Sequence, residues 1–294
     1  MKKLKVIMID AFKPSYLKYS PYLTSLSKKY QHGELDMGIG HWNGVETLFK
    51  GSSDIISIFY KNEKSSLKLV RYLLWLKIFG KAGRVLVETL INFPRLIKGY
   101  ELVRTDNIPL DKLCKLDISI NKHFAKEHDF VYFGELDRIG HKYGTKSREI
   151  KIAIKKIEQK ISKIDWDLIF SDHGMADVKK IISVPITNEC FIDSDMARYW
   201  DSEENLKIIR ERLPLEYGKI INWNKKYGDL IFLANTGVLI YPNFWNEKPV
   251  KAMHGYDGKD KDMKAFYIIK KAGGEKDIKA MELHEELKEY INGK

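Results

Sequence analysis

The sequence predicts an α/β domain built on parallel strands. Three short apolar runs each lead into an acidic residue: Leu4 to Ile9 into Asp10, Phe130 to Phe133 through Gly134 into Asp137, and Leu168 to Phe170 through Ser171 into Asp172. An isoleucine-rich helical pattern separates the last two runs. Alternation of short apolar strands with helices is typical of a sheet that has helices packed against it.

The first apolar run, Leu4 to Ile9, is continuous and rich in branched residues, as expected of a strand buried on both faces. Ser20 to Tyr30 then carries apolar residues at helical spacing, with Pro21 at a position that suits the first turn of a helix. The chain is therefore expected to open with a strand, a loop and a helix.

The later elements follow the same logic. Ser147 to Ile164 repeats isoleucine at helical spacing with lysines opposite, and this predicts the amphipathic crossover helix that parallel strands require. Leu230 to Tyr241 predicts two strands joined as a hairpin, with Gly237 in the turn. Ala265 to Ile269 is expected to be a buried strand and Met281 to Ile291 a closing helix.

The chain has 294 residues, which favours one domain over residues 1–294 with a helical cap or insert at about 60–125. Within that insert, Leu67 to Tyr100 mixes Leu, Trp and Phe with Lys and Arg at helical periodicity. We interpret this segment as helices packed on the domain with basic outer faces. A cap over the substrate and a face that touches anionic lipid are alternatives, and membrane-surface contact is not predicted.

The net charge of +11 favours anionic ligands but does not define a function. Because no nucleic-acid-binding motif accompanies it, a nucleic acid partner is not expected. Cys114 and Cys190 lie far apart without a CxxC pattern, which excludes a disulfide framework and a thiolate zinc site. The N-terminal apolar run is too short for a signal peptide and no run reaches about 18 apolar residues, so a cytoplasmic location is expected.

Several histidines stand beside Gly or Asp. They occur in Gly40-His41, Gly140-His141, Asp172-His173-Gly174 and His254-Gly255. Carboxylates and imidazoles together suit zinc, with manganese or iron as alternatives, and glycine allows close approach of backbone and ligand. The carboxyl ends of parallel strands face one crevice, so the acids that follow them can converge there. We therefore predict a metal centre made by Asp10, Asp137, His141, Asp172, His173 and His254.

Two divalent ions are expected at this centre. The side chains of Asp172 and His173 diverge because the residues are adjacent, so they can serve two ions about 3.5 to 4 Å apart, as binuclear hydrolases require. Asp137 and His141 are four residues apart and are expected on one short loop at a strand end. Hydrolysis of a phosphate ester places charge on the nonbridging and leaving oxygens, which two cations can stabilise.

The motifs around these residues resemble the alkaline phosphatase superfamily, and within it the nucleotide pyrophosphatase/type I phosphodiesterase branch. The matching segments are Val6-Ile-Met-Ile-Asp10-Ala-Phe, Asp137-Arg-Ile-Gly-His141, Ser171-Asp-His-Gly-Met175 and His254-Gly-Tyr-Asp257. The last two motifs, in this order and separation, carry the strongest resemblance. It covers most of the chain and implies an alkaline phosphatase-like fold, with a mixed, mostly parallel central sheet flanked by helices.

The resemblance also implies an activity. Members of this branch hydrolyse phosphodiesters or nucleotide pyrophosphates, and related members hydrolyse phosphomonoesters, so the expected substrate is a phosphorylated small molecule or a lipid-linked phosphate. By the same resemblance, Asp10, Asp172 and His173 hold one metal and Asp137, His141 and His254 the other, usually zinc. The alternative is a noncatalytic, metal-containing binder of phosphorylated ligands. The sequence does not indicate the oligomeric state.

The chain departs from the family at the nucleophile. The family places Thr or Ser at the start of a helix that runs to a Thr-Gly or similar turn, which here resembles Lys50-Gly51. Counting back without a gap reaches His41, and with one gap Gly40, and neither is a hydroxyl. Three hypotheses follow: His41 accepts the phosphoryl group or acts as acid and base, a metal-bound hydroxide attacks while His41 orients the phosphate, or the site turns over poorly.

Three further residues have two interpretations each. Thr47 is the nearest hydroxyl to the expected nucleophile position, but the apolar residues around it favour a helix interior. Asn43 is expected either to donate to a phosphate oxygen, as a nearby Asn does in the family, or to cap a helix. Arg198 lies in a segment, Phe191 to Trp200, that resembles prokaryotic members. It is expected either to form a structural ion pair or to bind the substrate phosphate.

Overall fold

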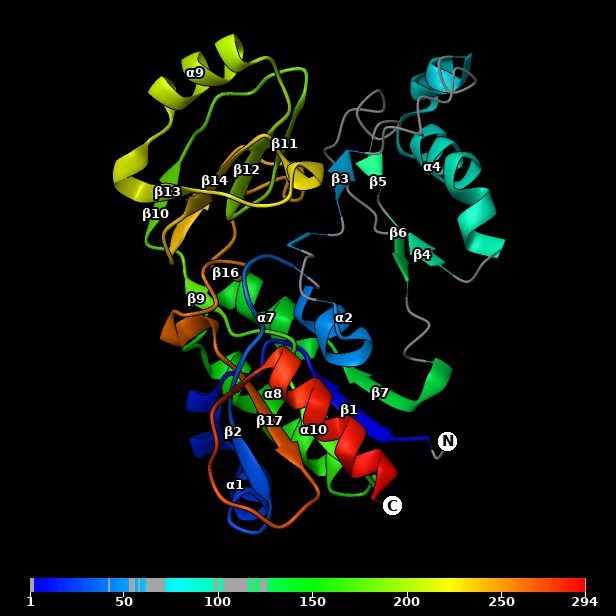
Figure 1. Cartoon of the computed structure of the whole chain (residues 1–294), viewed down its shortest axis with the longest axis vertical. Coiled ribbons are helices and arrows are strands. Elements are labelled where there is room, and N and C mark those ends of the chain that lie inside the picture. Colours follow the sequence, from blue (N-terminus) through cyan, green and yellow to red (C-terminus); the bar gives the residue numbers. More distant parts are fainter. Residues whose placement is uncertain are drawn as a thin grey trace.

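A computed structural model describes residues 3–41, 43–52, 56–57, 59–61, 72–97, 100–102, 116–117, 119–121 and 126–293. Figure 1 shows a body that contains the central sheet, a lobe that carries helix α9 (Glu203–Arg212), and a segment that carries helix α4 (Gly80–Ile97). The body contains both the first and the last described residues, so the other two parts are inserted between its elements.

The central sheet of the body has six strands in the order β18-β2-β17-β8-β1-β7. Their bounds are β1 (Lys5–Ile9), β2 (Gln31–Asp36), β7 (Asp129–Phe133), β8 (Leu168–Phe170), β17 (Ala265–Ile269) and β18 (Ile278–Lys279). Strand β1 pairs in parallel with β7 and β8, whereas β17 runs antiparallel to β8 and β2. The sheet is therefore mixed and mostly parallel, which confirms the expected fold class.

Strand β1 shows why the sheet is buried on both faces. Side chains alternate along a strand, so Val6 and Met8 pack on one face while Ile7 and Ile9 pack on the other. The first face is covered by α2 (Asn43–Lys50) and α10 (Ala280–Asn292). The second face is covered by α1 (Pro21–Ser27) and α8 (Arg148–Ile161). The continuous apolar run predicted for this strand is explained by two helical layers.

The predicted crossover helix is confirmed as α8. Ser147 caps it by accepting a hydrogen bond from the backbone N–H of Ile150 at 3.3 Å. Four of its isoleucines, Ile150, Ile154, Ile157 and Ile161, are buried against the sheet, and its lysines face solvent. Other short helices are η1 (Pro14–Tyr19), α7 (Glu135–Tyr143), η4 (Leu215–Tyr217), η5 (Lys225–Tyr227) and η6 (Lys261–Met263).

The lobe with α9 has an antiparallel sheet in the order β11-β12-β14-β13. The strands of this sheet are β11 (Cys190–Ile192), β12 (Met196–Tyr199), β13 (Gly218–Ile221) and β14 (Leu230–Ala234). Two separate strand pairs are β10 (Lys180–Ile182) with β15 (Val238–Ile240), and β9 (Ala176–Asp177) with β16 (Ala252–Met253). The predicted hairpin at Gly237 is wrong. β14 pairs with β12 and β13, and β15 pairs in parallel with β10, because the chain turns between them onto different sheets.

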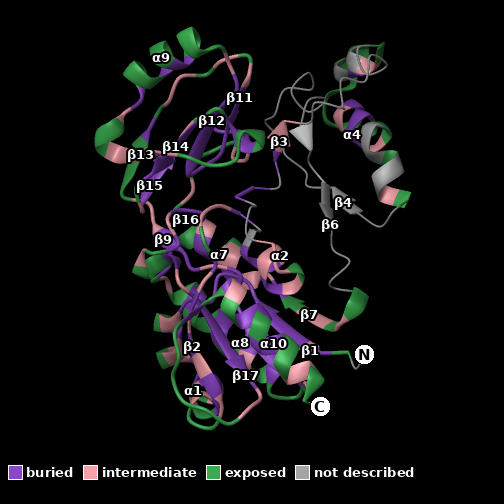
Figure 2. Ribbon diagram, viewed as in Figure 1, coloured by how far each residue is buried: buried purple, intermediate pink, exposed green. Residues whose placement is uncertain are grey.

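The chain leaves the body after α2 and returns at β7 (Figure 1). Between them lie β3 (Tyr60–Lys61), η3 (Leu74–Phe79), α4, β4 (Tyr100–Leu102), β5 (Leu116–Asp117) and β6 (Ser119–Asn121). Leu86, Leu90 and Phe93 of α4 are exposed beside Lys81, so its described outer surface is partly apolar and not only basic as we expected. Figure 2 shows exposed residues along this helix. Across the described residues, no helix is both long enough and apolar enough to cross a bilayer.

Glu286 fastens α10 to the sheet. Its carboxylate accepts hydrogen bonds from Lys271, Lys276 and Gln31 at 2.8, 2.6 and 2.6 Å. Burial alone would raise the pKa of Glu286, but these hydrogen bonds outweigh burial and hold the pKa below its ordinary value of 4.5. The carboxylate therefore stabilises the folded state at pH values above its ordinary pKa. This contribution is lost as the pH falls through the lowered pKa of the folded state.

We therefore expect Glu286→Gln to flatten the acid side of the stability profile. The wild-type protein should lose more free energy of unfolding than the variant between about pH 7 and about pH 3, measured by urea denaturation. Glu285→Gln is the matched control, because Glu285 is 59% exposed and pairs at the surface with Lys288 at 3.0 Å and more distantly with His284 at 3.9 Å. An equal loss of unfolding free energy at low pH in the wild type and in Glu286→Gln would contradict the inference that the Glu286 carboxylate stabilises the folded state.

Candidate metal centre

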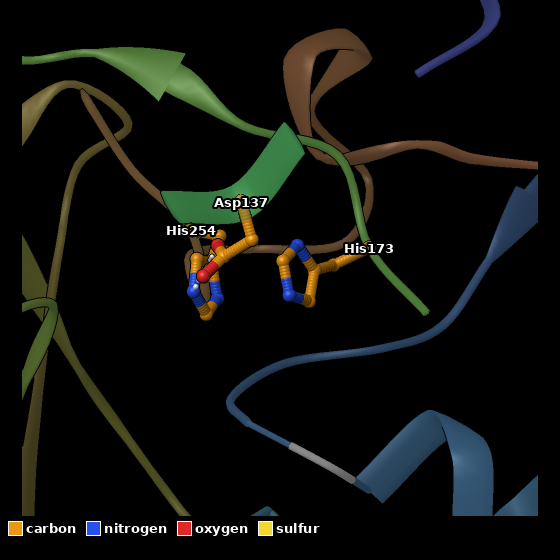
Figure 3. A group of neighbouring side chains, drawn as sticks. All are labelled: Asp137, His173 and His254. Atoms are coloured by element: carbon orange, nitrogen blue, oxygen red, sulfur yellow. Dashed lines mark ion pairs between the residues drawn. The ribbon is translucent and has the colours of Figure 1, made fainter. Parts of the chain in front are cut away.

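The predicted ligands converge at the carboxyl edge of the central sheet. Asp10 directly follows β1 and Asp172 follows β8, and these neighbouring parallel strands bring both acids to one edge. Asp137 and His141 lie one turn apart on helix α7, and not on the short loop that we expected. Figure 3 shows Asp137 directed from α7 toward His254, with His173 beside them on a separate loop.

The first cluster joins Asp10, Asp172 and His173. Nε2 of His173 lies 3.3 Å from Oδ1 of Asp10 and 3.4 Å from Oδ2 of Asp172. One donor atom from each of the three residues fits within 4.8 Å of the others. Asp10 and Asp172 are buried, and the His173 side chain is 15% exposed. Two carboxylates and one imidazole therefore point at one small volume.

The second cluster is centred on Asp137. Its Oδ1 lies 3.1 Å from Nε2 of His141 and 3.4 Å from Nε2 of His254. Donor atoms of Asp137, His254 and His173 also lie within 4.8 Å of one another, so His173 adjoins both clusters. The rings of His173 and His254 stack with centroids 3.7 Å apart. Asp137 and His141 are each 24% exposed, so the centre is open to solvent on this side.

Backbone carbonyls orient two of the imidazoles. Nδ1 of His141 donates to the carbonyl of Ala252 at 2.8 Å, and Nδ1 of His173 donates to the carbonyl of Gly174 at 2.9 Å. A carbonyl only accepts hydrogen bonds, so each Nδ1 carries the hydrogen and each Nε2 presents a lone pair to the cluster. This arrangement is typical of histidines that hold metal ions.

The electrostatics of the clusters fit bound cations. Burial, with the nearby carboxylates, raises the pKa of Asp172 well above its usual range, and burial raises the pKa of Asp10. Burial opposes ionisation of Asp137 too, but the imidazoles of His141 and His254 beside it hold its pKa well below the usual range. Among the described residues, Oδ1 of Asp10 and Oδ1 of Asp137 lack hydrogen-bond partners. Divalent ions would supply the partners that these oxygens lack.

The comparisons with known proteins agree with this geometry. A family sequence model described as Type I phosphodiesterase / nucleotide pyrophosphatase matches residues 104–222, a stretch that includes Asp137, His141, Asp172 and His173. Over this stretch, which is less than half of the chain, the sequence is similar to this branch of the alkaline phosphatase superfamily. The resemblance seen in the motifs is thereby confirmed.

One curated relative and several solved structures extend the comparison. Ectonucleotide pyrophosphatase/phosphodiesterase family member 7 of Rattus norvegicus is 23% identical over 175 residues, which are 47% of this chain and 40% of that protein. The alignment therefore spans less than half of that relative. Murine ectonucleotide pyrophosphatase/phosphodiesterase 5 superposes with a TM-score of 0.67 at 15% identity, covering 99% of this chain and 95% of that one.

The same murine protein, as an inactive variant in complex with AMP, also gives a TM-score of 0.67, at 16% identity with the same coverage. The human protein gives 0.64 at 16% identity, again over 99% of this chain and 95% of that one. At such identities the likeness establishes a shared fold over nearly the whole chain.

His41 lies beside the candidate metal centre, just before α2. Nε2 of His41 donates to Oδ1 of Asp195 at 2.8 Å, and its ring centroid is 4.7 Å from that of His254. Both His41 and Asp195 are buried. Burial opposes a charge on His41, but attraction to the Asp195 carboxylate outweighs burial and raises the pKa of His41. Asp195 was not predicted, because its partner is 154 residues away in the sequence.

Close packing around Gly255 explains why the His254-Gly255 motif contains glycine. Gly255 has φ +93°, and a Cβ there would lie 2.7 Å from both Nε2 of His41 and Oδ2 of Asp195. Its carbonyl also accepts a hydrogen bond from the backbone N–H of Gly40 at 2.8 Å. Any side chain at this position would therefore displace the His41–Asp195 pair from its place beside His254.

Arg198 forms a buried ion pair with Asp193, which favours a structural role for Arg198 over contact with a substrate phosphate. Its guanidinium is fully buried and donates to Asp193 Oδ2 and Ser57 Oγ, each at 3.1 Å, and it stacks on the ring of Phe191. We therefore do not retain Arg198 as a contact for the substrate.

Asn43 is the first residue of α2, and its side chain lies outside the described part of the structure. Thr47 lies within α2 and donates to the carbonyl of Ser52.

Supporting residues were missed by the sequence analysis. The hydroxyl of Tyr132, on β7, donates to Oδ2 of Asp10. The backbone N–H of Ala11, a residue with φ 57°, donates to Oδ1 of Asp172 at 3.3 Å. A hydroxyl within the apolar run of β7 was the available signal for Tyr132. Ala11 carried no signal, because its strained backbone is not visible in the residue type.

Ligand variants should lose metal. Asp172→Asn and His254→Ala should each weaken zinc or manganese binding by more than about 100-fold, since even loss of an outer-shell partner costs 10- to 100-fold. Elemental analysis after dialysis measures the content per chain. Asp229→Asn and His32→Ala serve as matched controls, because Asp229 is exposed and His32 bonds the carbonyl of Tyr30 away from the centre. Unchanged metal content in both ligand variants would contradict the site.

Proposed function

We propose that the protein hydrolyses phosphate esters with two divalent metal ions, acting on phosphodiesters or nucleotide pyrophosphates and, as a second class, on phosphomonoesters. The observation that carries this proposal is the convergence of three carboxylates and three imidazoles at one edge of the sheet. Asp10, Asp172 and His173 would hold one ion, and Asp137, His141 and His254 the other. Zinc suits this donor set, with manganese or iron as alternatives.

Bound divalent ions supply Lewis-acid stabilisation of the phosphoryl and leaving oxygens. The carboxylates of this chain set the charge of the centre. Three carboxylates against two dications leave a single positive charge, which attracts an anionic phosphate. Asp137 and His141 lie on the solvent-exposed side, so the phosphate would approach past α7.

His41 is proposed to act where other family members use Ser or Thr. The Asp195 carboxylate accepts from Nε2 of His41, which leaves Nδ1 as the nitrogen that can take a proton or a phosphoryl group. Asp195 also fixes the plane of the ring, as the acid does in a catalytic triad. Asp195 is therefore a positioning residue, and Gly255 leaves room for the pair.

The substrate class follows from the family. The murine relative was solved in complex with AMP, so we propose a nucleotide or a similarly sized phosphorylated molecule for this chain, with a lipid-linked phosphate as the second choice. A noncatalytic binder is less well supported, because the metal-ligating residues are brought together and a titratable group stands beside them. The cytoplasmic location stays a prediction.

Turnover of two chromogenic esters tests the proposal. Full-length protein loaded with zinc or manganese should hydrolyse bis-p-nitrophenyl phosphate, p-nitrophenyl phosphate or both, and a chelator should abolish this activity. His41→Ala should lower kcat by at least about 100-fold with metal content unchanged, the usual range for losing a positioned acid or base. Asp195→Asn should lower kcat less and shift the pH profile, since His41 remains but loses its carboxylate.

The outcomes separate the hypotheses. Bound metal without turnover of either ester would contradict hydrolysis and favour the noncatalytic binder. Full activity in His41→Ala would overturn the role of His41 and favour direct attack by solvent. His32→Ala is the control, since His32 is a histidine that lies outside the centre, and it should retain wild-type activity.

A further inference from the structure

A cavity of about 580 Å³ lies between the body and the lobe that carries α9. We call it the interlobe pocket, and it is lined by Thr47, Lys219 and residues 36–39, 221–223, 257–259 and 279–281. None of the described residues in this lining is a metal-ligand candidate, His41 or Asp195. Cavities of this size at the junction of two parts of a protein are typical sites for small molecules.

One side of the interlobe pocket offers an apolar wall and an indole ring. Ile221, at the end of β13, and Ile39, before α2, pack against the same apolar cluster, which fixes this wall. Trp223 lines the pocket and is 38% exposed, so part of its ring is accessible to a molecule there. An indole can stack on the flat ring of a ligand, and such stacking tolerates many ring types.

Both carboxylates that line the interlobe pocket are already paired with lysines. Asp36 pairs with Lys264 at 2.9 Å and also accepts a hydrogen bond from the backbone N–H of Gly38 at 2.9 Å. Asp257 pairs with Lys219 at 2.5 Å. An anion that enters the pocket therefore meets no unpaired carboxylate among the described residues of its lining.

Two further lysines of the interlobe pocket have no ion pair. Lys259 and Lys279 are exposed, and neither forms an ion pair within the described part of the chain. Glu282 accepts a hydrogen bond from the backbone N–H of Lys279 at 2.6 Å, not from its ammonium group. Lys259 lies near Asp257, but that carboxylate is bound by Lys219. The pocket therefore combines two available ammonium groups with an apolar wall.

The interlobe pocket shares its walls with the segments that carry His41 and His254. Gly38 leads toward His41, and Gly258 follows His254. A Cβ at Gly258 would lie 2.5 Å from the carbonyl oxygen of Gly38, so the two segments are in direct contact. A ligand in the pocket would contact both segments, while the candidate metal ligands lie outside its lining.

We propose that the interlobe pocket binds a small phosphate monoester that carries a flat aromatic ring, at a site separate from the metal centre. A phosphate monoester carries close to two negative charges at neutral pH, which matches the two ammonium groups of Lys259 and Lys279, whereas a carboxylate carries one. The ring stacks on Trp223, and the Asn222 amide can donate to or accept from its polar edge. A nucleoside monophosphate combines these features.

Calorimetric titration of the full chain tests this proposal, with AMP as the probe and with adenosine and inorganic phosphate as separate arms. AMP should bind at least about tenfold more tightly than either of its parts. Trp223→Ala should weaken AMP binding by at least about tenfold, because stacking on the ring is lost. Lys259→Gln combined with Lys279→Gln should weaken AMP binding by at least about tenfold and leave adenosine binding unchanged.

A variant of the metal centre separates the two sites. Asp172→Asn should retain the AMP site that Trp223→Ala weakens, because Asp172 does not line the pocket. The result does not depend on hydrolysis, so absence of ester turnover would leave it standing. Loss of all AMP binding in Asp172→Asn, with wild-type binding in Trp223→Ala, would place AMP at the metal centre and overturn the proposal.

Matched controls carry the same substitutions elsewhere. Trp75→Ala replaces a tryptophan that is 57% exposed on η3, and Lys28→Gln combined with Lys29→Gln replaces two exposed lysines after α1. Both variants should bind AMP like the wild type, and circular dichroism must show all variants folded. Equal loss of AMP binding in these controls, adenosine binding as tight as that of AMP, or no AMP binding by the wild type would overturn the proposal.

Discussion

Mutual repulsion among the carboxylates at the edge of the sheet is the constraint on which the rest of the site depends. Asp10 and Asp172 are buried within reach of one His173 nitrogen, and Asp137 stands beside them. Burial of several negative charges at one point is costly unless cations or hydrogen bonds offset it. The raised pKa values of Asp10 and Asp172 express this cost. Two bound cations would remove it and would create the positive centre that a phosphate ester needs.

The surrounding fold holds the charges in place in spite of this repulsion. Parallel pairing of β1 with β8 sets the spacing of Asp10 and Asp172, and α7 brings Asp137 and His141 to the same edge. Tyr132 and the backbone of Ala11 donate hydrogen bonds to the carboxylates. Backbone carbonyls hold the rings of two histidines. The site is thus preorganised by hydrogen bonds that do not depend on the substrate.

The lobe with α9 contributes Asp195 to the site. Asp195 lies between β11 and β12, and the buried ion pair of Asp193 with Arg198 holds the base of the same turn. The Asp193–Arg198 ion pair therefore links the packing of this lobe to the position of His41. Removal of one partner of a buried ion pair typically costs 3 to 5 kcal/mol, so on the order of 3 kcal/mol of folding stability depends on it.

Local patterns in the sequence predicted strands β1, β7 and β8 and the crossover helix α8, and they selected six candidate metal ligands that lie together in the structure, because each pattern depends on neighbouring residues. Pairing between distant segments was not predictable in the same way. The strands on either side of Gly237 join different sheets, and the partner of His41 is Asp195, far along the chain. The apolar face of α4 also escaped prediction, because periodicity identifies a helix but does not say which side is packed.

Anomalous X-ray diffraction from crystals grown with zinc tests the central claim most directly. We predict two anomalous peaks about 3.5 to 4 Å apart, one among Asp10, Asp172 and His173 and the other among Asp137, His141 and His254. A single peak would contradict the binuclear centre, and the absence of any peak at these residues would contradict the metal site altogether.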